Sequence, residues 1–134
     1  DSAASNNNLD LFEEVRLAAL LHKGVTGDPT VVPAAEALRL GTAHGAKALG
    51  WDGEAGIGRL KPGMKADFIA VSTDKSHFTP QTDLVSHLVY AASGSDVQHA
   101  WVDGRQIMRN RQLLTLDEER IVREAQACFE RLRG

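Results

Sequence analysis

Cysteine is nearly absent from this sequence, aromatic residues are scarce, and basic residues are in no excess. The single cysteine, Cys128, excludes a disulfide framework, so we expect a reducing, cytoplasmic setting. The net charge of −3 offers no basic surface to nucleic acid or to an anionic membrane. The longest apolar runs are far shorter than the roughly 20 residues that span a bilayer, and no secretory signal precedes them. We therefore expect neither nucleic acid nor a membrane as a partner.

Signatures of a self-contained hydrolytic site are missing as well. The histidines are widely spaced, at His22, His44, His77, His87 and His99. None forms a His-x-His pair or a His-Glu-x-x-His arrangement, which would bring two ring nitrogens to one metal ion. A Gly-x-Ser-x-Gly nucleophile elbow is also absent. We therefore do not expect this chain to form a complete metal site by itself.

Helical periodicity dominates the first 50 residues. Apolar residues at helical spacing predict a helix over residues 9–24, where a lysine and a glycine supply the stop. A second helix is predicted to begin within residues 30–34, where a proline fits the first turn, and to reach Leu49. Gly41 and Gly45 lie four apart on that helix. They favour the close approach of a neighbour, although they could instead merely weaken the helix.

The second half is predicted to mix strands with short helices. Phe68–Val71 is a continuous apolar run, as expected of a strand covered on both faces. A short helix is predicted from Leu84 and is expected to be closed by Gly94. Thr115-Leu-Asp-Glu118 reads as a capping box that opens a final helix. The apolar stripe of that helix comprises Ile121, Val122, Ala125, Cys128, Phe129 and Leu132, and there we expect the thiol to be inert packing.

A β-hairpin is the clearest local prediction. Residues 97–102 and 105–109 are β-prone and flank the dipeptide Asp103-Gly104. Asp-Gly favours a type I′ turn, in which both central residues take positive φ.

Residues 56–71 carry a motif: Gly58, then Leu60, then Pro62-Gly63, then Ala66-Asp67 running into the apolar strand. Pro62-Gly63 is typical of a turn, because proline presets one backbone angle and glycine accepts a positive one. The arrangement resembles the segment by which metal-dependent amidohydrolases re-enter a small β-sandwich after completing a (β/α)8 barrel. Every fixed position of that family pattern, Gly-x-Leu-x-x-Gly-x-x-Ala-Asp-apolar-apolar, is met here.

The resemblance implies an α/β fold class, the C-terminal end of a (β/α)8 TIM barrel followed by part of a small composite β-sandwich and a terminal helix. Residues 1–52 would be the last helices of the catalytic barrel, and residues 53–115 the C-terminal part of the sandwich. Residues 116–134 would form a terminal helix that packs back on the body. A barrel alone takes about 250 residues, so this chain of 134 is expected to be the C-terminal part of a longer enzyme.

The first fourteen residues resemble a more specific segment. Asp1-Ser-Ala-Ala-Ser-Asn-Asn-Asn-Leu-Asp-Leu-Phe-Glu-Glu is similar to the stretch after barrel strand eight in deaminases that act on S-adenosylhomocysteine and 5′-methylthioadenosine. The resemblance implies that Asp1 ligates the catalytic metal and accepts a proton from the attacking water. It would place Ser2, Ser5 and Asn6 in the loop at the mouth of the site, where the alternative is helix capping and turn formation. Without the resemblance, an N-terminal aspartate is most often a surface residue.

The implied activity is metal-dependent hydrolytic deamination of an adenosine thioether to the inosine analogue and ammonia. The implied metal is zinc, with iron as an alternative, and the enzyme is expected to be a homo-oligomer. The chain alone is expected to be inactive, because the missing N-terminal part would supply the histidine ligands. Two alternatives stay open: another amidohydrolase, such as a guanine-type deaminase or a chlorotriazine hydrolase, and a non-catalytic structural or assembly module.

Overall fold

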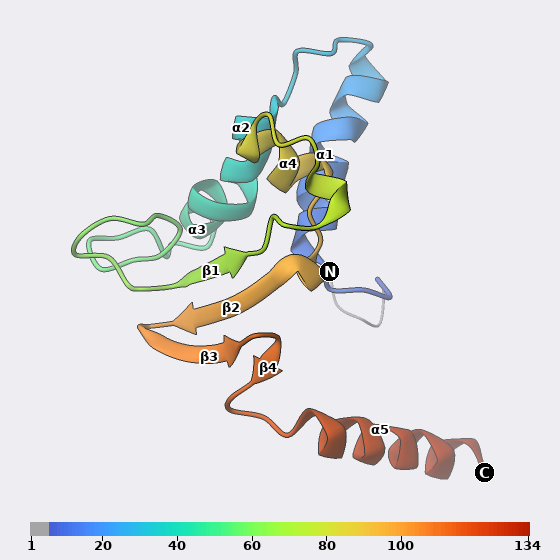
Figure 1. Ribbon diagram of the computed structural model, residues 1–134. Coiled ribbons are helices and arrows are strands. Elements are labelled where there is room, and N and C mark those ends of the chain that lie inside the picture. The colour runs from blue at the N-terminus through green and yellow to red at the C-terminus, as the bar shows by residue number, and fades with distance from the viewer. Residues whose placement is uncertain (1–5) are drawn as a thin grey trace.

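The computed structural model describes residues 6–134, which form a mixed α/β fold. All helices but the last gather on one side, and a four-stranded antiparallel sheet of order β1-β2-β3-β4 lies below them in Figure 1. The α-helices of this part of the chain are α1 (Leu11–Thr26), α2 (Ala34–Arg39), α3 (Gly45–Ala48), α4 (Leu84–Tyr90) and α5 (Glu118–Arg133). The strands are β1 (Phe68–Val71), β2 (Val97–Val102), β3 (Arg105–Arg109) and β4 (Gln112–Leu113).

Helix α1 runs farther than its sequence pattern predicts. It continues through Gly24 to Thr26, and the left-handed cap is Gly27, with φ of 68° and an N–H that donates to the carbonyl of Lys23. The predicted stop at Gly24 is therefore wrong by three positions, because glycine only weakens a helix unless its backbone leaves the helical region. Lys23 instead donates from Nζ to the carbonyls of Val31 and Val32, which fixes the following loop.

The second predicted helix runs without interruption from residue 34 to residue 48, but its middle turn is π-helical. Between α2 and α3 the backbone forms a π-helical turn, Leu40–His44. Gly41 lies in this turn, and a Cβ there would stand 2.6 Å from a methyl carbon of Val15 on α1. The predicted close packing at Gly41 is thus confirmed, whereas a Cβ at Gly45 would meet a carbonyl oxygen within the same helical segment. The small core that results is formed by Val15, Ala19, Ala37 and Val89.

The hairpin prediction is confirmed. Strands β2 and β3 pair antiparallel around Asp103 and Gly104, whose φ values are 50° and 77°. Strand β1 differs from its prediction because it pairs only with β2 and lies at the edge of the sheet. Phe68 and Ile69 are 36% and 50% exposed, so the expected covering of both faces is not provided by residues 6–134.

Between β1 and β2 the chain turns back over the helices. A 3-10 turn, Ser76–Phe78, buries Phe78 completely, and α4 follows. Helix α4 ends at Tyr90, earlier than predicted, and Gly94 instead begins a second 3-10 turn, Gly94–Asp96.

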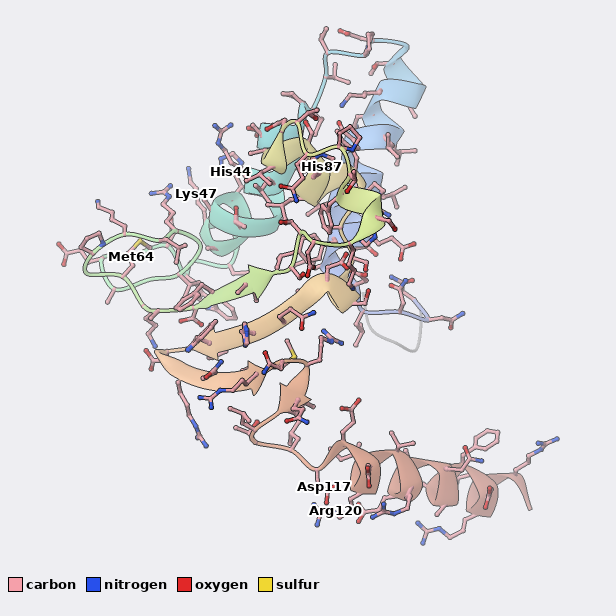
Figure 2. All side chains as sticks on the ribbon, in the orientation of Figure 1. His44, Lys47, Met64, His87, Asp117 and Arg120 are labelled. Carbon is pink, nitrogen blue, oxygen red and sulfur yellow. The ribbon has the colours of Figure 1, made fainter. Side chains whose placement is uncertain are left out.

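Helix α5 extends away from the sheet, and all of its residues are exposed (Figure 1). Its cap is Asp117, whose side chain accepts a hydrogen bond from the backbone N–H of Arg120. Both residues lie at the first turn in Figure 2. The predicted capping box beginning at Thr115 is therefore misplaced by two positions. Within residues 6–134 this helix has no buried residue, and the packing of residues 116–134 on the body stays a prediction. No helix of this part of the chain is long and apolar enough to cross a membrane.

Candidate functional site

Asp1, the predicted metal ligand and proton acceptor, lies outside the described residues, as do Ser2 and Ser5. The description begins at Asn6, which donates from its amide to Glu14 over 3.0 Å. Asn8 donates to Glu13 in the same way. The asparagine run is thus folded onto the first turn of α1, and the loop that follows Asp1 is anchored from residue 6 onward.

Asp10 caps α1 and also reaches a distant segment. One carboxylate oxygen accepts from the backbone N–H of Phe12 at 3.0 Å. The other accepts from the backbone N–H of Gly94 at 2.8 Å, across 84 positions of sequence. A Cβ at Gly94 would stand 3.5 Å from the Asp10 carboxyl group, which is ordinary van der Waals contact. The start of α1 is therefore tied to the turn that precedes β2.

Arg16, in the second turn of α1, makes a second hydrogen bond between this helix and the segment before β2. Its Nη2 donates to the carbonyl of Ala92 at 2.5 Å. Its Nε is buried and has no acceptor among residues 6–134. From the sheet side, Arg111 donates to the carbonyls of Gly94 and Val97 at 2.9 and 3.0 Å. Hydrogen bonds from the helices and from the sheet thus converge on the backbone of residues 92–97.

Asp96 is the buried carboxylate of this junction, with no exposed surface. It accepts hydrogen bonds from Lys75 Nζ at 2.7 Å, from the backbone N–H of Ser93 at 2.9 Å, and it lies 3.1 Å from His77 Nε2. Burial alone raises the pKa of Asp96, but these hydrogen bonds outweigh it and lower the pKa to about 2. The carboxylate therefore stays ionised and joins the 3-10 turn at Ser76–Phe78 to the start of β2.

The histidines do not converge. His44 pairs with Glu36 at 3.3 Å on the helical side, and His87 lies 3.1 Å from the carbonyl oxygen of Pro80. Figure 2 shows His44 and His87 on separate helices. Residues 6–134 contain no group of three histidine, cysteine, aspartate or glutamate side chains that could hold a metal ion. This part of the chain therefore offers no complete metal site.

The motif at residues 56–71 has a structural role that is visible in its contacts. Gly58 has φ of 91°, and a Cβ there would stand 2.7 Å from the Cβ of Ala46 on α3. The carboxylate of Asp67 accepts from the N–H of Asp103, and the Ala66 carbonyl accepts from the N–H of Gly104. The motif thus packs a loop on the helices at one end and holds the hairpin tip at the other.

The sequence matches the model of the amidohydrolase family over residues 1–107, which is most of the chain. The chain belongs to the amidohydrolase family. The motif that packs Gly58 on α3 and ties Asp67 to the hairpin lies within the matched residues.

Named relatives lie within this amidohydrolase family. The chain is 56% identical over 126 residues to a 5-methylthioadenosine/S-adenosylhomocysteine deaminase of Pelotomaculum thermopropionicum, covering 94% of the chain and 28% of the relative. It is 52% identical to a 5′-deoxyadenosine deaminase of Methanosarcina acetivorans, covering 98% of the chain and 30% of the relative. The chain thus spans less than a third of the length of these curated relatives.

A solved amidohydrolase structure shares the shape of the chain. The crystal structure of an adenosine deaminase from Xanthomonas campestris with bound zinc matches with a TM-score of 0.93 at 38% identity. The match covers 99% of this chain and 30% of that one.

Asp10, Arg16 and Asp96 are not singled out by the sequence analysis. Asp10 and Arg16 both fall inside the helix predicted over residues 9–24, whereas the structure begins α1 at Leu11 with Asp10 as its cap. Their partners are backbone groups about 80 residues away, which leave no trace in residue type. Only Asp96 has a local signal, because Ser93-x-x-Asp96 has capping-box spacing and the structure forms that box.

Proposed function

We propose that this chain is the C-terminal part of an enzyme that hydrolytically deaminates an adenosine-type nucleoside, an adenosine thioether such as S-adenosylhomocysteine or 5′-methylthioadenosine. The observation that carries the proposal is the identity of 52–56% to deaminases of adenosyl compounds over nearly all of the chain. Because those relatives are more than three times as long, the remaining parts of the active site would come from residues outside the chain. The same identities favour this branch over a guanine-type deaminase or a chlorotriazine hydrolase.

The proposal includes a divalent metal, most simply zinc, which the structure of the Xanthomonas campestris enzyme contains. Residues 6–134 do not fit a metal site by themselves. The resemblance of the first fourteen residues to the stretch after barrel strand eight supports Asp1 as the one ligand from this chain, and the histidine ligands would come from the rest of the enzyme; a carboxylate oxygen is a ligand that zinc accepts. When bound, such an ion makes water acidic enough to act as a nucleophile near neutral pH.

The role that we propose for Asp1 is proton transfer. Its carboxylate would take a proton from the attacking water as the new C–O bond forms at the ring carbon that bears the amino group. The C–N bond then breaks, and the nitrogen leaves as ammonia after a second acid, supplied from outside this chain, has protonated the ring and the departing nitrogen. The products are the inosine analogue and ammonia, so one water is consumed for each turnover.

The proposed place of the chain in the enzyme follows the sequence interpretation. Residues 1–52 would complete the (β/α)8 barrel, residues 53–115 would form part of the sandwich, and residues 116–134 would be the terminal helix. Barrel enzymes carry catalytic groups at the carboxyl ends of strands, which is where Asp1 would fall. A cytoplasmic homo-oligomer is part of the same proposal, and the lone cysteine of this chain supports the cytoplasmic setting.

The test is an ultraviolet assay of the full-length enzyme with adenosine, 5′-deoxyadenosine, 5′-methylthioadenosine, S-adenosylhomocysteine and guanine. We expect conversion of adenosyl compounds to inosine analogues and no turnover of guanine. Asp1→Asn is expected to lower kcat by about 100-fold or more, since a positioned general base contributes roughly 10²–10⁴-fold. Asp52→Asn, at an exposed loop position, is the matched control and should leave kcat unchanged. Turnover of guanine alone, or full activity of Asp1→Asn, would overturn the proposal.

A further inference from the structure

Helix α5 carries an apolar stripe that nothing within residues 6–134 buries. The stripe consists of Ile121, Val122, Ala125, Cys128, Phe129 and Leu132. Two of its large side chains, Phe129 and Leu132, are 56% and 88% exposed. An amphipathic helix of this length is marginal in water unless its apolar face is covered. The stripe therefore requires a partner surface.

The direction of α5 does not result from the short length of this chain. In Figure 1 the helix runs away from the sheet and from helices α1 to α4. The Xanthomonas campestris structure matches 99% of this chain with a TM-score of 0.93, although the match covers only 30% of that longer protein. The matched part therefore includes α5, so a much longer protein holds the corresponding helix in a similar direction.

The spacing of the stripe is that of a coiled-coil helix. Apolar residues separated by four, three and four positions occupy the a and d positions of a heptad, which form the seam of such a helix pair. The seam residues of α5 are Ile121, Ala125, Cys128 and Leu132. Val122 and Phe129 follow at e positions and widen the seam on one side. Glu124 and Arg131 precede it at g positions, where charged side chains select the partner helix.

The charges at the two ends of α5 favour an antiparallel partner of the same sequence. The first turn is acidic, with Glu118 and Glu119. The last turn is basic, with Arg131 and Arg133. In an antiparallel pair the acidic turn of each copy lies near the basic turn of the other, and the helix dipoles oppose one another. A parallel pair would instead bring like charges together at both ends.

The seam also fixes a register for this pair. If Ala125 packs beside the partner's Cys128, two small side chains meet near the two-fold axis, and the same offset brings Glu124 beside the partner's Arg131. Within its own helix Glu124 has only an exposed partner, Arg120, at 3.7 Å. The larger apolar contacts in this register join Ile121 to Leu132 and Val122 to Phe129. Each contact occurs twice, as two-fold symmetry requires.

We propose that the apolar stripe of α5 binds the same stripe of a second copy of this chain, as an antiparallel helix pair. The inference names a contact for the homo-oligomer of the proposed function, but it does not depend on the reaction that the enzyme catalyses. Stable dimers bury roughly 1,200–2,000 Å² of surface. One helix pair of this length supplies only part of that area, so the test uses the full-length protein.

Disulfide cross-linking tests the register. Full-length protein with Ala125→Cys and Cys128→Ser is co-expressed with differently tagged wild-type protein, so each copy has a single thiol on α5. Mild oxidation should link Cys128 of the wild-type copy to the new thiol, and mass spectrometry of the linked peptides identifies the bond. The matched control replaces Ala125→Cys with Ala127→Cys, which is exposed on the same helix but off the stripe, and should give little of the linked product. Absence of the link in the first mixture, or equal linking in both, would overturn the inference.

An exchange of charges tests the pairing independently. Glu124→Arg should raise the dimer dissociation constant about 10-fold, because two ion pairs become repulsive, and analytical ultracentrifugation measures it. Adding Arg131→Glu should restore the wild-type value. Positions 124 and 131 lie too far apart along one helix to pair within a copy, so restoration reports contact between copies. Glu130→Arg, on the opposite face of the helix, is the matched control and should change the constant less than about 2-fold.

The outcomes separate this interface from the proposed function. A full-length protein that is monomeric, or a dimer that Glu124→Arg does not weaken, would show that α5 packs on its own chain or elsewhere and would overturn the inference. Wild-type protein that dimerises through α5 but deaminates no adenosyl compound would overturn the proposed function and leave the interface in place.

Discussion

At the scale of single residues, one buried carboxylate joins segments that are distant in sequence. Asp96 is fully buried, yet Lys75, Ser93 and His77 surround it with hydrogen-bond partners. These partners stabilise the folded chain only while the Asp96 carboxylate is ionised, so protonation of Asp96 lowers the stability.

The pKa of Asp96 predicts how stability depends on pH. Its folded-state pKa of about 2 lies below the ordinary value of 3.8, so the unfolded chain binds the proton more readily. The contribution of Asp96 is therefore complete above about pH 4 and is lost as the pH falls toward 2. We expect Asp96→Asn to lower the free energy of unfolding by about 2 kcal/mol at pH 7, because Lys75 and Ser93 lose a charged acceptor. Urea unfolding of the full-length protein at several pH values measures this, and an equal loss at pH 2 and pH 7 would contradict it.

Gly58 gives a second prediction at this scale. Its φ of 91° suits glycine alone, and an added Cβ would press on Ala46, Ala43 and Thr42. Gly58→Ala should therefore destabilise the protein by about 2 kcal/mol or more. The control is Gly24→Ala, since α1 is helical there and a Cβ meets nothing within 4 Å. That change should be neutral or stabilise by up to about 1 kcal/mol, as measured by thermal unfolding.

At the scale of elements, local chemistry predicted the hairpin and the helical character of the first 50 residues. The turn at Asp103-Gly104 requires positive φ at these two residues only, so the local sequence was enough to predict the hairpin. Helix ends were less predictable, because Gly24 continues its helix and Asp117 competes successfully with Thr115 as a cap. The Asp10–Gly94 tie could not be predicted at all, because it depends on tertiary placement of a backbone N–H.

Helix α5 lets capping be measured in isolation. It has no buried residue, and a helix of 16 residues without tertiary packing is marginal in water, so its cap should have a large influence. In a peptide of residues 115–134, Asp117→Ala should remove about 1 kcal/mol of helix stability and visibly lower the circular dichroism at helical wavelengths. Asp117→Ser should retain most of the signal, whereas equal helicity in all three peptides would show that Asp117 is not the cap.

At the scale of the whole molecule, the described residues leave much apolar surface in water. Trp51, Leu60, Ile69, Val122 and Phe129 are each at least half exposed. Strand β1 also lies at the sheet edge. Exposed edges and apolar patches favour association.

The 134-residue chain should therefore self-associate when it is produced alone. Light scattering at micromolar protein should detect species larger than a monomer, and Phe129→Ser with Val122→Ser should reduce them. The same preparation should not retain stoichiometric zinc by elemental analysis, because residues 6–134 offer no set of ligands. A zinc-loaded monomer that turns over S-adenosylhomocysteine would contradict the fragment interpretation.

The bond between Asp10 and Gly94 also has a consequence for synthesis on the ribosome. The two partners are separated by 84 positions, and ribosomes add about 5–20 residues per second, so roughly 4–17 s pass before α1 can meet its anchor. During that interval the first turn of α1 lacks its hydrogen bond to Gly94. Chaperones that shield nascent chains would therefore be expected to act on this segment before the final hairpin has emerged.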